Sequence, residues 1–158
     1  MTIFIEIAPE FQNSPDLPNF HKCILATLDA QGVSIEYDLS LAIDNDERIR
    51  ELNYEFLGQD KPTDVLAFPA QHVDPDSGNP YLGDVIVSFP RAQAQAEKAG
   101  HTVTAELYLL TIHGILHLLG HNHDQPEKKA RMWHAQKQVL AELGVQVNLA
   151  DIEVQSER

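Results

Sequence analysis

Residues 103–123 read V-T-A-E-L-Y-L-L-T-I-H-G-I-L-H-L-L-G-H-N-H, and this stretch decides how the rest of the chain is arranged. Over residues 103–119 the side chains are apolar on nearly every side of a helix of 3.6 residues per turn. A helix that is apolar all round has to be covered by other elements. The sequence therefore predicts a central, buried helix, which is a rigid element on which to hold functional side chains.

Three histidines of this stretch, His113, His117 and His123, have the spacing of a metal site. Residues four apart lie on one face of a helix, so His113 and His117 can direct two imidazoles at one ion. Gly120 predicts the end of the helix, because glycine adopts the left-handed C-terminal conformation at little cost. His123 would then approach as the third ligand, with His121 as the alternative. Three nitrogen ligands leave the fourth position of a tetrahedral zinc ion open, as in catalytic sites.

Other residues of the chain restrict the kind of metal site and the reaction that these histidines can support. Structural zinc sites usually have four protein ligands, often cysteines, whereas this chain has one cysteine, Cys23, far from the histidines. Zinc peptidases with this spacing have a Glu directly after the first histidine as general base, and Gly114 occupies that position here. We therefore expect one catalytic Zn²⁺ per chain and a reaction other than peptide hydrolysis. Three imidazoles also suit nickel or copper.

The remaining sequence predicts a layered domain of strands and helices. Alternating apolar residues over 33–43 indicate a strand with one buried face. Asp44, with Glu47 three residues later, is typical of a capping box that opens a helix ending near Leu57. The other expected elements are strands at 2–7, 65–68 and 84–88, a proline-containing loop at 69–82, and helices at 17–30, 90–98 and 125–143, the last capped by Asp124. This order predicts an α/β or α+β fold: a single layered domain with a small mixed four-stranded sheet, about five helices, and the metal site at the end of the central helix.

Length and composition indicate one folded domain. The chain has 158 residues, 43% of them apolar, and no run of about 18 apolar residues that could cross a membrane. The start M-T-I-F-I-E lacks a basic region and places Glu6 within the apolar run, so we expect no signal peptide. A single cysteine excludes an internal disulfide, and these features fit the cytoplasm. We expect one domain over residues 1–143 and an acidic C-terminal tail over residues 144–158.

The net charge of −13 argues against non-specific binding of nucleic acid. An enzyme that acts on RNA would have to gather its cations in one place. Lys128, Lys129 and Arg131 form a compact basic group directly after the metal motif, and Arg91 is a further candidate for contact with RNA phosphate. The alternative for these side chains is a solvated helix surface. A bound divalent ion would add positive charge of its own.

Three blocks of this sequence resemble the YbeY family of bacterial endoribonucleases and ribosomal RNA maturation factors. Residues 113–123, H-G-I-L-H-L-L-G-H-N-H, match the family pattern H-G-x-L-H-L-x-G-x-D-H. The second block is L-N at 52–53 followed by P-T-D-V-L-A-F-P at 62–69, and the third is L-G-D-V-I-V at 82–87. The resemblance extends over residues 33–143.

The resemblance implies a single α/β domain with a bound zinc ion that cleaves single-stranded RNA. It further implies a role in 3′-end maturation of 16S ribosomal RNA and in ribosome quality control, with the ribosomal small subunit and its assembly factors as partners. The chain departs from the family pattern at two positions. Leu57 replaces an Arg that many members have, and Asn122 replaces an Asp before the last histidine. If that Arg holds a phosphate, another cation must do so here.

Proton transfer requires a group other than the missing Glu. The candidates are His121, beside the ligand turn, and Asp64 and Asp84, each of which could instead cap a turn. A zinc-activated water could attack phosphorus, or it could act as base on the ribose 2′-hydroxyl and leave a cyclic phosphate. Two hypotheses stay open: a metal-dependent endoribonuclease, or a zinc-stabilised ribosome assembly factor that acts by binding. The acidic charge of the chain suits basic ribosomal proteins as partners.

Overall fold

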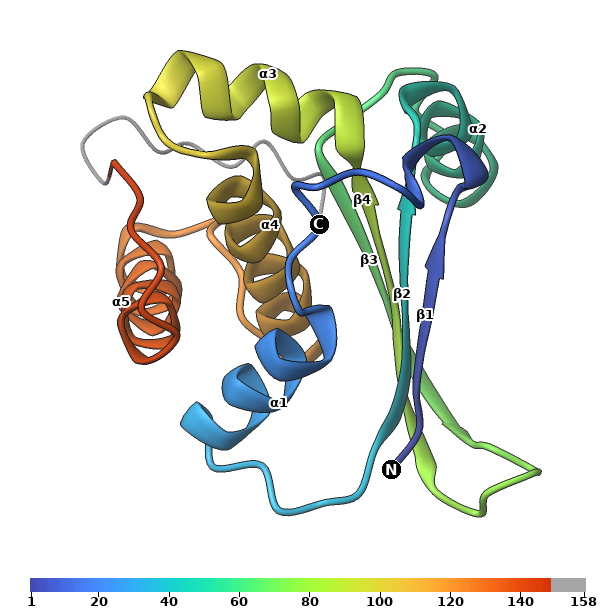
Figure 1. The fold of residues 1–158 in the computed structure, drawn as a ribbon. Coiled ribbons are helices and arrows are strands. Elements are labelled where there is room, and N and C mark those ends of the chain that lie inside the picture. The colour runs from blue at the N-terminus through green and yellow to red at the C-terminus, as the bar shows by residue number, and fades with distance from the viewer. Residues whose placement is uncertain (149–158) are drawn as a thin grey trace.

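The computed structural model describes residues 1–148 and shows a twisted sheet with most of its helices on one side (Figure 1). The strands are β1 (Ile3–Ile7), β2 (Asp38–Asp44), β3 (Val65–Val73) and β4 (Pro80–Ser88). The helices are α1 (Phe20–Ala30), α2 (Asp46–Leu57), α3 (Phe89–Ala99), α4 (Val103–Leu118) and α5 (Pro126–Glu142), with a 3-10 turn at Pro9–Phe11. The described residues thus form an α/β domain with a four-stranded sheet and five α-helices, which confirms the predicted fold class.

The sheet is mixed, and its strand order is β1-β2-β4-β3. β1, β2 and β4 run parallel, whereas β3 is antiparallel to β4. Leu39, Leu41 and Ile43 of β2 alternate toward the helices and are fully buried, because successive side chains of a strand point to opposite faces. One face of the sheet therefore carries the main core, and α2 covers part of the other face (Figure 1).

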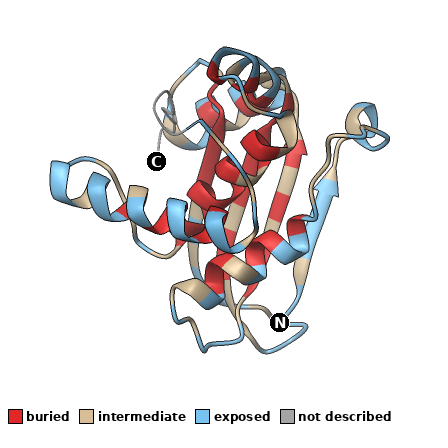
Figure 2. Cartoon of the chain, turned by 60° about the vertical axis from the view of Figure 1, so that its left-hand side comes forward, coloured by how far each residue is buried: buried red, intermediate tan, exposed pale blue. Residues whose placement is uncertain are grey.

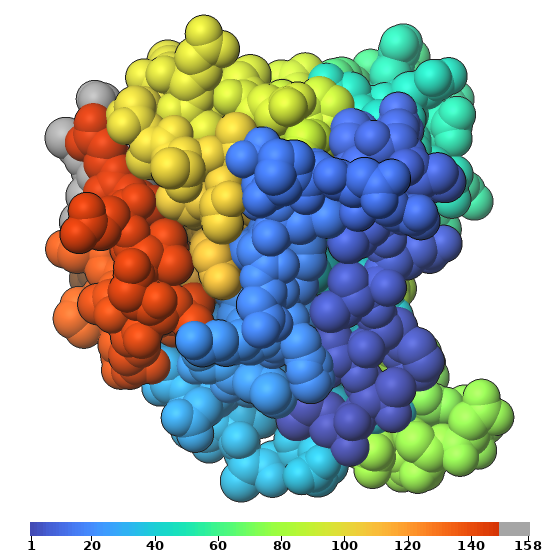
Figure 3. Space-filling model, in the orientation of Figure 1, coloured from blue at the N-terminus to red at the C-terminus, as the bar shows by residue number. Residues whose placement is uncertain are grey.

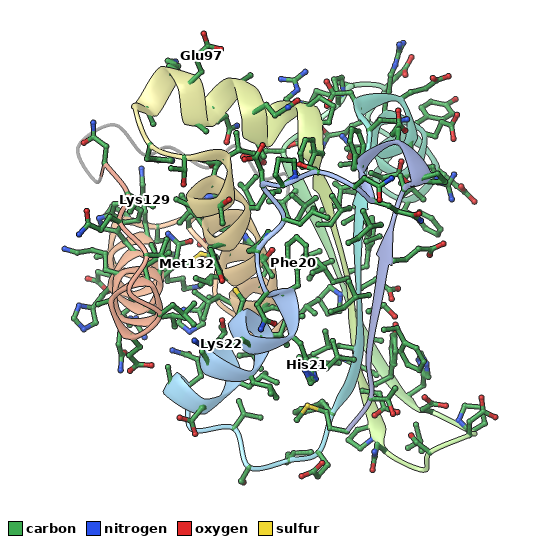
Figure 4. All side chains as sticks on the ribbon, in the orientation of Figure 1. Phe20, His21, Lys22, Glu97, Lys129 and Met132 are labelled. Carbon is green, nitrogen blue, oxygen red and sulfur yellow. The ribbon has the colours of Figure 1, made fainter. Side chains whose placement is uncertain are left out.

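Helix α4 is the central element, as its sequence predicts. Every residue from Leu109 to Leu118 is buried, and Figure 2 shows the helix as an almost unbroken buried rod. One apolar cluster joins α4 to the sheet and α1, and a second joins it to α5. Phe20 belongs to the first cluster and Met132 to the second, and both are labelled in Figure 4. The metal-bearing helix is thus fixed from two sides by packing alone.

Two of the predicted strand boundaries are wrong. Residues 33–37 are not a strand: β2 begins at Asp38, and the pairing with β1 begins at Ile3 opposite Leu39, so the segment before it has no neighbour to pair with. The predicted loop at 69–82 is mostly strand, because β3 and β4 extend to Val73 and Pro80 as a hairpin that projects from the body (Figure 1). Pro69 is tolerated within β3 because β3 lies at the edge of the sheet, where a missing N–H costs little.

Both predicted capping residues are also wrong, each by one position. Asn45 caps α2 by accepting a hydrogen bond from the Arg48 N–H, while Asp44 remains the last residue of β2. α5 begins after Gln125 with no side-chain cap, and Pro126 occupies its first turn. A proline there has its backbone preset for a helix and lacks an N–H that would need a partner.

The predicted tail begins within the packed part of the chain. Val145 and Val147 pack against the cluster between α4 and α5, and the Asn148 side chain donates to the Ala99 carbonyl. The remainder of the predicted tail, residues 149–158, lies outside the described residues. Within residues 1–148 no helix has the length and apolar character that a membrane crossing requires.

Candidate metal centre

Three histidine side chains converge at the C-terminal end of α4. His113 and His117 lie one turn apart on the helix, and His123 follows the turn after it. Each offers a ring nitrogen, and these nitrogens lie within 4.8 Å of one another. The His113 and His117 Nε2 atoms are 3.1 Å apart. Such spacing allows all three nitrogens to reach one ion at about 2.0–2.1 Å.

The turn after α4 brings the third histidine back to the first two. Gly120 has a φ of 99°, which L side chains rarely adopt. The Gly120 N–H donates to the His117 carbonyl, and the His121 N–H donates to the Leu116 carbonyl, each at 3.0 Å. This pair of bonds is the Schellman motif, which satisfies the last carbonyls of a helix while reversing the chain. The predicted helix end at Gly120 is therefore close to the observed one.

His123, rather than His121, completes the triad. His121 Nε2 lies 2.7 Å from the Gln31 Oε1 atom at the end of α1, so that ring is engaged by α1. Burial and the nearby Arg131 charge both lower the pKa of His121. His123, in contrast, has a buried Nε2 atom with no hydrogen-bond partner among residues 1–148. A buried nitrogen without a partner is costly unless something else engages it, and a metal ion would do so.

The protonation state of His113 suits a cation. Burial and the neighbouring His117 and His123 lower the pKa of His113 to about 3, against the opposing effect of the hydrogen bond that His113 donates to Gln136. His113 is therefore a neutral imidazole at neutral pH, as a metal ligand must be. The donor set of three imidazoles fits zinc and leaves a coordination position for water or substrate.

The structure does not bring Asp84 to the triad. A Cβ at the preceding Gly83 would meet Leu118, and one at Gly114 would meet Val85, so the β4 residues on either side of Asp84 face α4. By strand alternation Asp84 points to the opposite face of the sheet. There its carboxylate accepts a hydrogen bond from the Tyr81 hydroxyl at 2.5 Å.

Asp64 also lies away from the triad, in a buried polar cluster near the start of α4. It accepts hydrogen bonds from the Val65 N–H at 2.8 Å and from Gln95 Nε2 at 3.2 Å. Its charge contributes to raising the pKa of Glu106, after the larger effect of burial. Glu106 precedes His113 by about two helical turns, or about 10 Å along α4.

The basic candidates divide into two groups. Lys128, Lys129 and Arg131 lie in the first turns of α5, directly after the ligand turn, and Arg131 is close enough to His121 to affect its pKa. Lys129 is exposed (labelled in Figure 4), and Lys128 Nζ lies 4.0 Å from Asp124. Arg91 instead begins α3 and contacts Asp46 of α2 at 3.4 Å.

Leu57 and Asn122, the two positions that depart from the family pattern, lie in different surroundings. Leu57 packs against a small apolar cluster formed by Ile49, Leu66 and Ile86. Asn122, beside the ligand His123, has a buried Oδ1 atom to which no group in the described part of the chain donates a hydrogen bond. The substitution at Leu57 therefore adds apolar contact, whereas the one at Asn122 leaves a polar atom unsatisfied.

Sequence reasoning missed two features. The first is Gln136 of α5, whose Oε1 atom lies 2.5 Å from His113 Nδ1. The sequence could have indicated this residue, because Gln136 is a polar residue on the apolar side of a helix, among Met132, Val139 and Leu140.

The second is a groove of about 950 Å³ on the outer face of the sheet, formed by β1, β2, β4 and α2. In Figure 3 the outline of the molecule is hollowed between α2 and the projecting hairpin. The exposed rings of Phe4 and Phe56 line this groove. Its acidic lining residues are Glu6, Glu10, Asp44 and Asp84.

The fold and the triad together define an α/β protein with a three-histidine site that can hold a catalytic metal ion. The sequence profile of the family described as endoribonuclease YbeY matches residues 10–144. The chain belongs to this family of endoribonucleases, as its sequence blocks predict.

Curated relatives support the assignment over most of the chain. An endoribonuclease YbeY of Halalkalibacterium halodurans is 44% identical over 117 residues, which cover 69% of this chain and 74% of that protein. An endoribonuclease YbeY of Acetivibrio thermocellus is 35% identical over 162 residues, which cover 94% of this chain and all of that protein. A Thermotoga maritima protein solved in solution is similar in structure, with a TM-score of 0.56, 28% identity and coverage of 90% of this chain and 92% of that one.

Proposed function

We propose that this chain is a single-strand-specific, metal-dependent endoribonuclease that matures the 3′ end of 16S ribosomal RNA and takes part in ribosome quality control. The convergence of His113, His117 and His123 on one point carries the proposal. Family membership supplies the class of reaction, which is endonucleolytic cleavage of RNA. The catalytic domain would comprise residues 1–143, and the acidic tail of residues 144–158 would begin with Val145 and Val147 packed against that domain. A ribosomal RNA substrate would place the protein in the cytoplasm.

The proposed cofactor is one Zn²⁺ per chain, held by these three histidines. When bound, zinc supplies a Lewis acid and lowers the pKa of coordinated water to about 7. Because imidazoles bind a metal ion in their neutral form, three such ligands would leave the charge of the ion undiminished. That charge attracts a phosphodiester to this point of a protein whose net charge is −13.

The proposed roles of the surrounding residues follow from their positions. Lys128, Lys129 and Arg131 would contact RNA phosphates beside the ligand turn, because they open α5 directly after it. His121 would move a proton to or from the reacting RNA, since its ring is oriented by Gln31 and lies next to the turn. Asp64, Asp84 and Arg91 receive no such role, because their observed partners lie on other parts of the fold.

The deciding experiment compares the purified protein with a folded His117→Ala variant on a single-stranded 3′ fragment of 16S ribosomal RNA. His134→Ala is the matched control, because His134 is an exposed histidine of α5. We expect cleavage by the wild type and by the control, and a loss of at least 100-fold, on the order of a metal-bound catalyst's contribution, in His117→Ala. Equal cleavage by all three proteins would reject the proposal. A cyclic phosphate on the product would identify the ribose 2′-hydroxyl as the nucleophile.

The acidic groove favours a second function, a binding role in ribosome assembly. Its acids and exposed aromatic rings are complementary to a basic protein surface, and Lys or Arg side chains also bind aromatic faces. A Glu6→Lys, Glu10→Lys variant tests this role by co-sedimentation with small ribosomal subunits. We expect weaker co-sedimentation with unchanged cleavage of free RNA, whereas unchanged co-sedimentation would exclude the groove as a docking surface.

A further inference from the structure

Gln136 of α5 contacts His113, the first histidine of the triad, on the side of its ring that faces away from His117. Its side chain is 3% exposed, and its Oε1 atom lies 2.5 Å from His113 Nδ1. An amide oxygen can only accept a hydrogen bond, so the proton of the neutral imidazole resides on Nδ1. The other ring nitrogen, Nε2, then carries the lone pair and accepts a hydrogen bond of 3.1 Å from His117 Nε2.

We propose that Gln136 is a positioning residue that fixes the tautomer and ring orientation of His113 and so prepares the site for zinc. A neutral imidazole has one donor and one acceptor nitrogen, and the hydrogen bond at one of them decides which can bind a metal. Without an acceptor at Nδ1, the proton can move to Nε2 and block the ligand position. The proposal rests on the assignment of His113 as a ligand in the proposed function.

The surroundings of Gln136 hold its acceptor in place. Met132, Ala135, Val139 and Leu140 of α5 belong to the apolar cluster that α5 forms with α4. A buried amide in such a cluster costs free energy unless it is hydrogen-bonded, and an apolar residue would pack there without that cost. The hydrogen bond to His113 is therefore the reason for a polar residue at this position.

The amide is also a neutral acceptor. A carboxylate behind the same imidazole would accept the same proton but would add a negative charge next to the ion. With Gln136, neither the three imidazoles nor their hydrogen-bond partner adds a negative charge, so the full charge of a divalent ion would remain. This suits a site that must attract RNA phosphate in a strongly acidic protein.

Zinc affinity measured by competition with a chelator, without RNA, tests the proposal. Gln136→Met removes the acceptor at nearly constant volume, Gln136→Glu keeps it, and Gln138→Met is the control at an exposed glutamine of the same helix. We expect about 10- to 100-fold weaker zinc binding in Gln136→Met, at least wild-type affinity in Gln136→Glu, and no change in Gln138→Met. Wild-type affinity in Gln136→Met, or equal losses in the Met and Glu variants, would overturn the proposal.

The tautomer can be read directly from the wild-type protein, which removes any dependence on folding of the variants. Long-range ¹H–¹⁵N correlation spectra of the zinc-free protein distinguish a protonated Nδ1 from a protonated Nε2. We expect His113 to be protonated on Nδ1, and protonation on Nε2 would refute the role of Gln136. Because neither readout uses RNA, a protein that binds zinc as expected but cleaves no RNA would disprove the proposed function alone.

Discussion

Gly114 lies where α4 packs tightly against β3 and β4 of the sheet. A Cβ at this position would fall 2.4 Å from Cγ1 and 3.1 Å from Cγ2 of Val85. The sequence identified Gly114 only as the absence of a catalytic Glu. The structure adds that no larger side chain fits between α4 and β4, so this fold excludes a general base at that position.

A Gly114→Ala substitution should therefore destabilise the protein. Overpacking of a well-packed core costs about 1–3 kcal/mol, which exceeds the gain of about 1 kcal/mol from replacing a helical glycine. Urea unfolding of the wild type and the variant measures the difference. Val85→Ala should partly rescue the variant, so that the two substitutions couple favourably. A variant more stable than the wild type would contradict the observed packing.

Glu106 predicts how the stability of the fold should change with pH. Burial raises its pKa, while the hydrogen bond from His101 at 2.7 Å opposes the shift. A carboxyl group whose folded pKa is raised destabilises the fold as pH rises above its ordinary value of 4.5. Glu106→Gln keeps an acceptor for His101 and removes that charge.

Denaturant unfolding at several pH values tests this. We expect the stability of Glu106→Gln relative to the wild type to increase as pH rises from about 4 to 8, with little difference at the acidic end, where Glu106 is protonated. Thr104→Val is a control on the same turn that changes no charge. A difference that is constant over this range would show that Glu106 is not the titrating group.

At the scale of elements, one carboxylate joins the tip of the β3–β4 hairpin to the start of β2. Asp38 accepts hydrogen bonds from Ser77 Oγ at 2.5 Å, from Asn79 Nδ2 at 3.3 Å and from the Thr2 N–H at 2.7 Å. These bonds, led by that of Ser77, lower the pKa of Asp38 to about 2. These hydrogen bonds to the ionised carboxylate therefore persist at neutral pH, and their contribution to stability is lost only as pH falls from 3.8 toward 2.

Asp38→Ala should loosen the hairpin without unfolding the core. The backbone amides of Gly78 and Asn79 should exchange with solvent faster in the variant, whereas the amides of α4 should keep their protection. Native-state hydrogen exchange makes the measurement, and Asp76→Ala at the exposed tip is the control. Equal acceleration in α4 would mean that Asp38 supports the whole domain.

The type of most elements could be predicted from sequence, but several boundaries could not. The helix at 103–119 was correct because its apolar surface on all sides requires burial whatever its neighbours are. Residues 33–37 share the alternation of a strand, yet β1 offers no partner there. Strand limits depend on pairing between distant segments, and this information is not contained in a local pattern.

At the scale of the whole molecule, the charge distribution predicts a weak dependence of RNA binding on salt. Three basic residues, Lys128, Lys129 and Arg131, adjoin the site, while the chain as a whole has a charge of −13. Each phosphate contact with single-stranded nucleic acid contributes about −0.7 to the slope of log K against log salt concentration. We expect a slope of about −2 for RNA binding, and a slope about 0.7 shallower for Lys129→Gln. A slope steeper than about −5 would require other cations.

Removal of the metal should leave the protein folded. α4 is held by apolar clusters on both sides, and neither cluster includes a metal ligand. We expect an unchanged far-ultraviolet circular dichroism spectrum in a chelator and a lower thermal midpoint, since zinc at about 100 times its Kd adds about 2.7 kcal/mol of stability. Loss of helical signal in the chelator would instead assign the metal a structural role.

The sequence by itself determined the central helix, the three histidines, the turn at Gly120 and the family, because all of these depend on local spacing or on contiguous blocks. Only the tertiary structure decided what surrounds them. It placed Gln136 behind His113, directed His121 to Gln31, and moved Asp84 to the opposite face of the sheet. The physical reason is that a contact between α4 and α5, or the face on which a β4 side chain lies, is set by the packing of segments far apart in the chain.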